Sequence, residues 1–102
     1  MPESKIFKPL DPLLHSELRL AVMSILLDAG SADFVYLKAE TGATSGNLSV
    51  QLDKLQQAGY IEVTKGFKGK MPQTVCRITD QGRNAFVSYV EALRSYISSD
   101  NR

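Results

Sequence analysis

The segment TSGNLSVQLDKLQQAGYIE, residues 44–62, restricts the possible folds more than any other part of the chain. Leu48, Leu52 and Leu55 recur at helical spacing, so they predict a helix that buries a narrow apolar stripe. Gly59 ends this helix, and the residues directly after it alternate between apolar and polar, as in a half-buried strand. The segment therefore predicts a helix that leads straight into a strand.

The other side of this helix carries small and polar residues instead of the Glu–Lys pairs that decorate an ordinary solvated helix. These residues are Gly46, Asn47, Ser49, Val50 and Gln57, flanked by Asp53 and Lys54. Side chains of this kind add little to a hydrophobic core. The purpose of such a surface depends on the elements around it.

Two further helices are predicted before this segment. The first runs from Ser16 to Ala29 with a broad apolar side, and Gly30 stands at the position that favours a helix stop. Asp33 can cap a second, short helix from Phe34 to Thr41, which Gly42 ends. The inward-facing side chains of the short helix are expected to be Phe34, Val35 and Leu37.

A β-hairpin is predicted after the third helix. Residues 60–65 and 73–79 both alternate with period two, and they are separated by the glycine-rich loop 66–72. The alternation places Cys76 on the same side of its strand as Ile78, which indicates a small buried thiol.

Thr79 and Asp80 can cap a last helix that extends to about Ile97. Its apolar stripe consists of Phe86, Tyr89, Val90, Leu93, Tyr96 and Ile97. The predicted fold class is therefore mainly α with a small β-hairpin, in the order three helices, hairpin and long C-terminal helix. This is the order of a winged helix-turn-helix domain.

The length of 102 residues leaves room for one domain. Within it we expect an N-terminal arm at 1–10, the winged helix-turn-helix at 11–79, the C-terminal helix at 80–97 and a tail at 98–102. The chain has one cysteine, no apolar run near the roughly 20 residues that span a bilayer, and no secretory signal pattern at its start. These features predict a cytoplasmic protein that does not enter a membrane.

The net charge of +1 is distributed unevenly along the chain. Residues 1–43 carry a net charge of −2, residues 44–79 carry +3 and residues 80–102 carry zero. No acidic residue occurs from Val63 to Thr79. A local positive field of this kind allows a nearly neutral protein to bind a polyanion.

Three segments resemble those of small winged helix-turn-helix transcription regulators of the MarR/ArsR-like type. They are LDPLLHSELRLAVMSILL, TSGNLSVQLDKLQQAGYIEV and GFKGKMPQTVCRITDQGRNAF. The family pattern L-S-x-x-L-x-x-L-x-x-x-G-[YL]-[IV] is matched from Leu48 to Ile61, and the pattern T-x-x-G-[RK]-x-A-[FL] from Thr79 to Phe86. The resemblance covers about residues 10–97.

The resemblance implies that the third helix enters the major groove of double-stranded DNA while the hairpin lies on the adjacent backbone or in the minor groove. Small polar side chains can reach base edges there, and Asn and Gln can pair bidentately with adenine. The expected contacts from the helix are Thr44, Ser45, Gly46, Asn47, Ser49, Val50, Gln51 and Lys54. The expected contacts from the hairpin are Lys65, Lys68 and Lys70 at its tip, with Arg77 as either a phosphate contact or a structural ion pair.

Two residues depart from what such regulators commonly carry. Val50 stands where a basic residue is frequent, so it either meets a thymine methyl group or simply packs. Asp53 lies on the expected contact side, where it would repel phosphate unless it pairs with Lys54 or tilts away.

The last helix is more apolar than the core of a small winged-helix domain requires, which predicts a homodimer. In winged regulators such pairing lets two third helices meet successive major grooves about 34 Å apart on a palindromic operator. The expected interface residues are Leu10, Leu14, Phe86, Tyr89, Val90, Leu93, Tyr96 and Ile97. The alternative to a dimer is that this apolar stripe only closes the core of a monomer. The function that follows from the DNA-binding fold is transcriptional regulation, in the form of a repressor.

The main alternative function is a winged helix that contacts another protein without binding DNA. Enzyme chemistry is not supported, because His15 and Cys76 are the only residues of their types and form no set with a nucleophile, base and acid. The same two residues make no metal site, and we expect no cofactor. No polar cluster indicates a pocket for an effector, whose identity the sequence leaves open.

Overall fold

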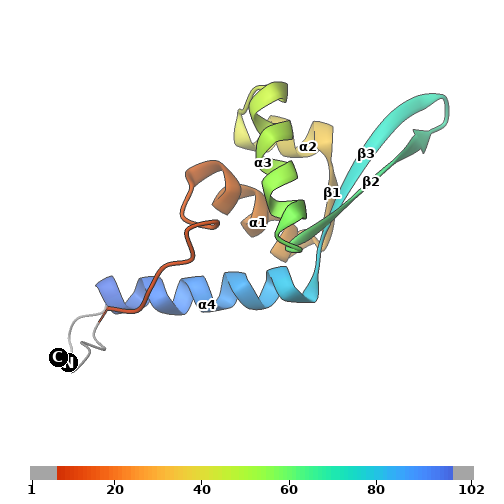
Figure 1. Cartoon of the computed structure of the whole chain (residues 1–102). Coiled ribbons are helices and arrows are strands. Elements are labelled where there is room, and N and C mark those ends of the chain that lie inside the picture. Colours follow the sequence, from red (N-terminus) through yellow and green to blue (C-terminus); the bar gives the residue numbers. More distant parts are fainter. Residues whose placement is uncertain (1–6, 98–102) are drawn as a thin grey trace.

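The computed structural model describes residues 7–97, and this part of the chain contains four helices and three strands (Figure 1). In chain order these are α1 (Glu17–Ala29), β1 (Ser31–Asp33), α2 (Phe34–Thr41), α3 (Ser45–Gln57), β2 (Ile61–Lys68), β3 (Met71–Ile78) and α4 (Asp80–Ile97). The predicted order of three helices, hairpin and long C-terminal helix is confirmed, and one short strand is added to it. Ile6, the first five residues and the tail at 98–102 lie outside the described residues.

The predicted helix boundaries are confirmed by their caps. The side chains of Ser16, Asp33 and Thr44 each accept a hydrogen bond from a backbone N–H of the first turn of the following helix. Gly30 and Gly42 follow α1 and α2 with φ of 84° and 72°, a left-handed conformation that glycine adopts without strain.

A single hydrophobic core lies between the first three helices and the sheet. Leu48, Leu52 and Leu55 of α3 are buried in it, as their spacing predicted. The other members are Leu14, Val22, Met23, Leu26, Leu37, Ile61, Cys76, Ile78 and Tyr89. The prediction for Val35 was wrong, because this side chain is 75% exposed and only Phe34 and Leu37 of α2 turn toward the core.

The sheet has three antiparallel strands in the order β1–β3–β2, and β1 was not predicted. Ser31, Ala32 and Asp33 pair with Arg77, Cys76 and Val75 of β3. Three residues are too few to display an alternating pattern, which is why the sequence does not predict this strand. It forms because the fold places these residues beside β3. Its effect is to make β3 the central strand and to tie the start of α2 to the sheet.

The wing, which we define as β2, β3 and the turn between them, is longer than predicted. The strands continue to Lys68 and resume at Met71, so the loop consists of Gly69 and Lys70 alone. Gly69 has φ of 63°, and within residues 7–97 positive φ occurs at glycines alone. This matches a two-residue hairpin loop that begins with glycine. Pro72 is tolerated in β3 because β1 stops short of it, so β3 has only one neighbour there.

The T-x-x-G pattern attaches α4 to the corner between α3 and β2. The Thr79 hydroxyl donates to Gly59 O at 2.6 Å and accepts from Gly82 N at 2.9 Å, while Thr79 N donates to Tyr60 O at 3.0 Å. A Cβ atom on Gly82 would lie 2.1 Å from Tyr60 O. Only glycine therefore lets the backbone of α4 approach this corner so closely.

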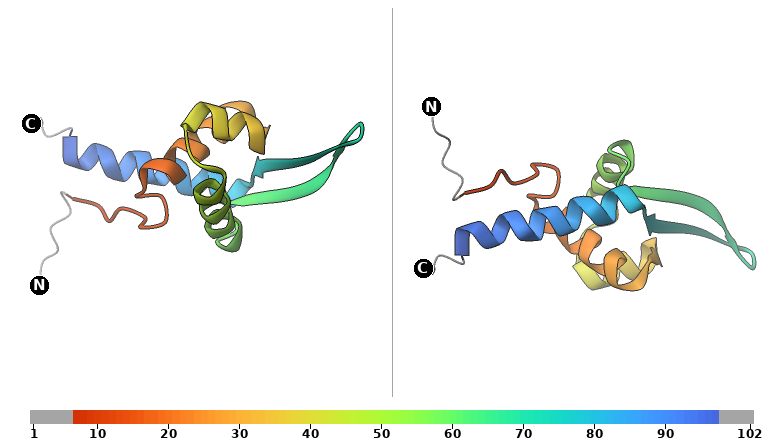
Figure 2. Two further views of the ribbon diagram at one scale, coloured as in Figure 1. Left: turned by 90° about the horizontal axis from the view of Figure 1, so that it is seen from above. Right: turned by 90° about the horizontal axis from the view of Figure 1, so that it is seen from below.

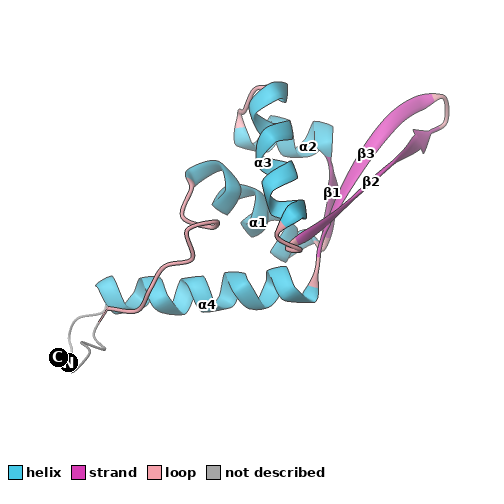
Figure 3. Cartoon of the chain, viewed as in Figure 1, coloured by secondary structure: helices cyan, strands magenta, loops and turns pink. Residues whose placement is uncertain are grey.

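The molecule is elongated, because the wing and the far half of α4 project from opposite ends of the helical body (Figure 2; Figure 3). The described part of the expected N-terminal arm runs along the far half of α4. Tyr96 Oη donates to Lys8 O at 2.8 Å, Lys8 N donates to Ser95 Oγ at 3.0 Å, and the rings of Phe7 and Tyr96 stack with centroids 5.1 Å apart. Residues 7–10 are thus docked on the protein's own last helix.

Candidate nucleic-acid interface

The N-terminal end of α3 and the tip of the wing lie on the side of the molecule opposite α4 (Figure 1). Of the eight residues of α3 and its N-cap that were expected to contact DNA, all except Gln51 are exposed. Leu48, Leu52 and Leu55 anchor the inner side of α3 in the core, and this fixes the outer side of the helix toward solvent. The small side chains at positions 45, 46 and 49 keep this outer surface low.

The N-terminus of α3 is suited to an anion. Thr44 Oγ1 accepts from Asn47 N at 3.1 Å, which satisfies one backbone donor of the first turn. The remaining free N–H groups of that turn, together with the helix dipole, favour a negative group such as a phosphate. No acidic residue occurs in the first turn of α3 to oppose this field.

Gln51 is half-buried, and its side-chain amide is hydrogen-bonded within the protein. Its Oε1 accepts a hydrogen bond from Arg19 Nη1 of α1, and its Nε2 donates to Asn47 Oδ1 at 3.0 Å. Arg19 is itself fixed, because its Nε donates to Leu13 O at 2.5 Å. Both ends of the Gln51 amide thus have a partner within the protein, and its contact with DNA stays a prediction. Sequence reasoning missed Arg19, which carries no local signal of this contact.

The pairing register of the wing divides its side chains between two faces. Directly opposite residues share a face, so Lys65 with Thr74 and Phe67 with Pro72 continue the side on which Ile61 and Val63 meet the core. Lys68 and Met71 lie on the other face. Lys65 is three residues short of Lys68, so its predicted position at the tip was wrong, while Lys68 and Lys70 do lie there.

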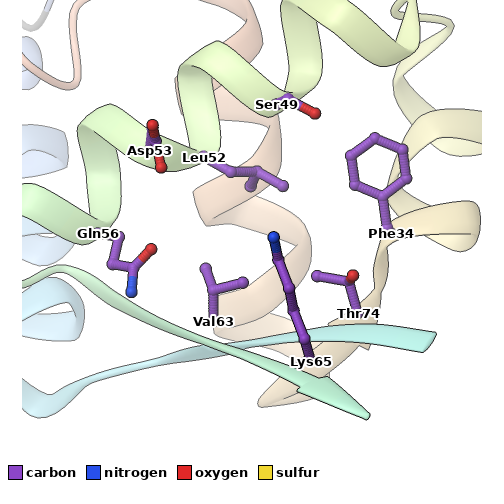
Figure 4. A pocket seen from close by; sticks show the side chains of 8 residues that line it. All are labelled: Phe34, Ser49, Leu52, Asp53, Gln56, Val63, Lys65 and Thr74. Atoms are coloured by element: carbon purple, nitrogen blue, oxygen red, sulfur yellow. The ribbon is translucent and has the colours of Figure 1, made fainter. Parts of the chain in front are cut away.

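A cleft of about 630 Å³ separates α3 from the wing (Figure 4). Lys65 extends its amine into this cleft toward α3, and Ser49 and Thr74 add hydroxyl groups to the walls. Asp53 also lines the cleft, so it is turned toward the wing rather than standing beside Asn47 on the outermost surface. The remaining walls are formed by Phe34, Leu52, Gln56 and Val63.

Arg77 lies on the face of the sheet that points away from the core. It is paired in register with Glu62, and the Nε–Oε1 distance of 3.7 Å makes an ion pair. Both side chains are 64% exposed, so this pair contributes little to stability. Arg77 was expected to be either a phosphate contact or a structural ion pair. The structure has the ion pair, with Glu62.

Two large apolar side chains on the wing were not anticipated as surface features. Phe67 is 73% exposed and Met71 is 69% exposed, and both stand next to the tip lysines. The sequence places both in a loop. The alternation of β2, which continues to Lys68, is the signal for Phe67, and Met71 follows from its pairing with Lys68.

Two residues expected at a dimer interface belong to the protomer's own core instead. Leu14 is fully buried, and Tyr89 is 4% exposed with its hydroxyl 2.9 Å from His15 Nδ1. The fold itself therefore covers them, and neither side chain is available on the surface. Leu10, Phe86, Val90 and Leu93 are half-buried, and Tyr96 and Ile97 are exposed.

The remaining titratable groups of the described residues are the candidates for a metal site. No group of three His, Cys, Asp or Glu residues is close enough there to hold a metal ion. Burial in the sheet, followed by the negative charge of Asp33, raises the pKa of the Cys76 thiol to about 11, so it is not a reactive thiolate near neutral pH. Between residues 7 and 97, no helix is long and apolar enough to cross a membrane.

The arrangement defines a class of protein: a winged helix domain with an exposed, capped helix and a basic wing. In agreement with this, residues 18–97 match the family of winged helix DNA-binding domains, and the chain belongs to that family. This is a family of DNA-binding domains and not of enzymes. The uncharacterized protein MJ0432 of Methanocaldococcus jannaschii is 34% identical over 79 residues, which are 76% of this chain and 85% of that protein.

Solved structures of transcriptional regulators have the same fold. The transcriptional regulator homologue from Pyrococcus horikoshii OT3 superposes with a TM-score of 0.81 and 27% identity, over 88% of this chain and 89% of that one. The MarR-family regulator from Silicibacter pomeroyi gives 0.65 and 20%, over 87% and 60%. The regulator MOSR of M. tuberculosis, solved in complex with DNA, gives 0.67 and 17%, over 86% and 62%. The predicted resemblance to MarR-like regulators is thereby confirmed for the fold.

Proposed function

We propose that this protein is a sequence-specific, double-stranded DNA-binding transcriptional regulator that acts as a homodimeric repressor. In this proposal α3 enters the major groove, and the wing follows the adjacent backbone or minor groove. The observation that carries it is the joint exposure of two surfaces on one side of the molecule: the low, capped N-terminal half of α3 and the lysine-bearing wing. The first can reach base edges, and the second can neutralise phosphates.

The positions of the lysines in the interface support the proposed binding of DNA. Lys54, Lys68 and Lys70 are exposed, and the cleft between α3 and the wing holds the Lys65 amine. A phosphate backbone along the wing would meet the Lys65 amine, while the α3 wall of the cleft presents the Asp53 carboxylate. Lys54 and the α3 N-terminus lie outside the cleft lining and offer further contacts for phosphate. These contacts provide affinity, whereas Thr44, Ser45, Asn47, Ser49 and Val50 supply the candidate base contacts.

A salt titration of DNA binding tests the central claim. Binding to a selected DNA site should weaken steeply with salt, and the slope of log K against log salt should fall by about 0.9 for each lysine that contacts a phosphate. Lys68→Ala and Lys70→Ala should lower both affinity and slope while leaving base preference unchanged. Lys8→Ala, which removes the same charge beside Ser95 and Tyr96 of α4, is the matched control and should bind as the wild type does.

Absent or salt-insensitive binding would contradict the proposal. That outcome would favour the alternative in which the winged helix contacts another protein. Equal losses from Lys8→Ala and Lys68→Ala would show that net charge, and not the wing, determines binding.

The homodimer part of the proposal rests on the apolar side of α4. Val87 and Ile97 are exposed, and Phe86 and Val90 border a shallow groove of about 350 Å³ together with Leu27 of α1. A second copy that covered this surface would leave α3 free, because α4 is on the opposite side of the molecule. Two-fold pairing there would present two α3 helices to a palindromic site.

Sedimentation at several protein concentrations tests the dimer. Val90→Glu places a charge in the proposed interface and should shift the protein toward the monomer. Val35→Glu makes the same change at an exposed position of α2 and should leave the mass unchanged. A wild-type monomer at high concentration would contradict the dimer and the palindromic operator together.

A further inference from the structure

A chain of hydrogen bonds runs from α1 into the exposed surface of α3. Leu13 O accepts from Arg19 Nε at 2.5 Å, Arg19 Nη1 donates to Gln51 Oε1, and Gln51 Nε2 donates to Asn47 Oδ1 at 3.0 Å. We name Arg19, Gln51 and Asn47 the amide relay. It begins in the turn before α1 and ends at a residue on the surface proposed to face DNA.

The direction of every hydrogen bond in the amide relay is determined by Arg19. A guanidinium group only donates, and it remains protonated throughout the accessible pH range. Gln51 must therefore turn its oxygen toward Arg19, which leaves its NH₂ group toward α3. Asn47 must in turn offer its oxygen to Gln51. The orientation of both amides follows from this donor-only group and does not rest on telling oxygen from nitrogen at either side chain.

The consequence for Asn47 is that its NH₂ group is the part left to face outward. The side chain is exposed, and no hydrogen bond from Nδ2 to another group occurs within residues 7–97. Because Gln51 holds the Asn47 oxygen, a ligand on the outer side would meet the N–H donors of the amide. Bidentate pairing with adenine requires the amide oxygen as acceptor at the same time, so the relay disfavours it.

We infer that Arg19 is a specificity-determining positioning residue, which acts through Gln51 to make Asn47 a hydrogen-bond donor toward base acceptors in the major groove. The inference rests on the proposed DNA-binding function. The acceptors concerned are guanine O6 and N7, adenine N7 and thymine O4. In this inference Arg19 acts only through Gln51, because the hydrogen-bond partners of its guanidinium group within residues 7–97 are Leu13 O and Gln51 Oε1.

Gln51→Glu reverses the last step of the relay without removing its first. A carboxylate satisfies Arg19 with one oxygen and turns the other toward Asn47, so Asn47 must now donate with Nδ2 and present Oδ1 outward. In selection from a random DNA pool, the preference at one base position should shift from acceptors toward the donors, cytosine N4 or adenine N6. We expect a change of roughly three- to tenfold in relative affinity, the effect of about one hydrogen bond.

Gln57→Glu is the charge-matched control, because it adds the same charge to α3 outside the amide relay. It should weaken binding to all sites alike and leave the preferred sequence unchanged. Asn47→Ala combined with Gln51→Glu should abolish the preference at the affected position. If Gln51→Glu binds DNA with the wild-type preference intact, the inference is wrong. If the wild type selects no sequence at all, the proposed function fails and the inference fails with it.

A measurement on the free protein separates these two failures. The side-chain ¹⁵N–¹H signals of Gln51 should differ from those of the exposed Gln56 and Gln57, since only Gln51 is engaged in the relay. Arg19→Met should move them to the positions of the two exposed glutamines while thermal unfolding shows the protein still folded. Gln51 signals that coincide with those of Gln56 and Gln57 in the wild type would overturn the relay, whatever the DNA result.

Discussion

The helix α3 and the wing face the same side of the molecule, but the rest of the fold holds them very differently. Three leucines of α3 are buried, and its outer surface is tied back to α1 through Arg19. In the outer half of the wing, every residue from Lys65 to Met71 is exposed. There β2 and β3 are held by their antiparallel pairing with each other. Groups that must meet a base edge require the first kind of support, whereas charges that attract a polyanion work without it.

The contrast extends to the way each element begins and ends. The start of α3 is capped by Thr44, and its end is connected through Gly59 and Tyr60 to the start of α4. The wing ends in a two-residue turn in open space, where a Cβ on Gly69 would meet no atom within 4 Å. A change near α3 is therefore expected to reach the whole fold, and a change near the tip of the wing is expected to remain local.

The largest difference should appear when an apolar side chain is removed from each element. Leu55→Ala leaves a cavity at a fully buried position and should lower the free energy of unfolding by about 2–5 kcal/mol. Phe67→Ala removes a larger side chain that is mostly exposed, and should change stability by no more than about 0.5 kcal/mol. Urea unfolding followed by circular dichroism measures both. Similar losses of stability from the two variants would show that Phe67 packs on the helical body, and would contradict the contrast between α3 and the wing.

A smaller difference is expected for a methyl group added to a glycine in each region. Gly82→Ala would bring Cβ within 2.1 Å of Tyr60 O, so α4 must shift, at a cost of about 1–3 kcal/mol. Gly66→Ala in β2 is the control, because nothing lies within 4 Å of the added carbon and the backbone has no positive φ. Thermal unfolding should separate the two variants clearly. A Gly82→Ala protein as stable as the wild type would mean that α4 is not closely attached at this corner.

The smallest effect concerns pH and the corner between α3 and β2. The hydrogen bond from Tyr60 Oη to Asp11 Oδ2, at 2.5 Å, raises the pKa of Tyr60 to about 12, with burial as a lesser cause. Because the folded state holds this proton more tightly than the unfolded state, its contribution is complete below about pH 10 and is lost as pH rises toward 12. Tyr60→Phe should therefore lose less stability than the wild type over that interval.

Tyr36→Phe removes an exposed phenol from α2 and serves as the control for this pH experiment. It should retain the wild-type difference in stability between pH 10 and 12. If Tyr60→Phe also follows the wild-type curve, the hydrogen bond to Asp11 does not stabilise the corner.

Most of the fold could be predicted from the sequence, because its signals are local. The spacing of Leu48, Leu52 and Leu55, the cap Asp33 and the alternation of the hairpin each depend on residues within one or two turns of each other. The charge map is likewise a property of the sequence itself. These local signals determined three helices, a hairpin and a last helix, and the T-x-x-G pattern marked where α4 begins.

Tertiary structure alone decided the features that depend on contact between distant residues. The strand β1 exists because Ala32 is brought opposite Cys76, and the buried Tyr89 has its hydroxyl 2.9 Å from Nδ1 of His15, 74 positions away in the chain. Nothing near Gln51 in the chain indicates that Arg19, thirty-two positions away, holds its oxygen. Periodicity tells which side of a helix is apolar, but the partner of a polar group is set by the packing of other elements. The composition of the α3 surface could therefore be predicted from the sequence. The orientation of the Gln51 and Asn47 amides could be determined only from the tertiary structure.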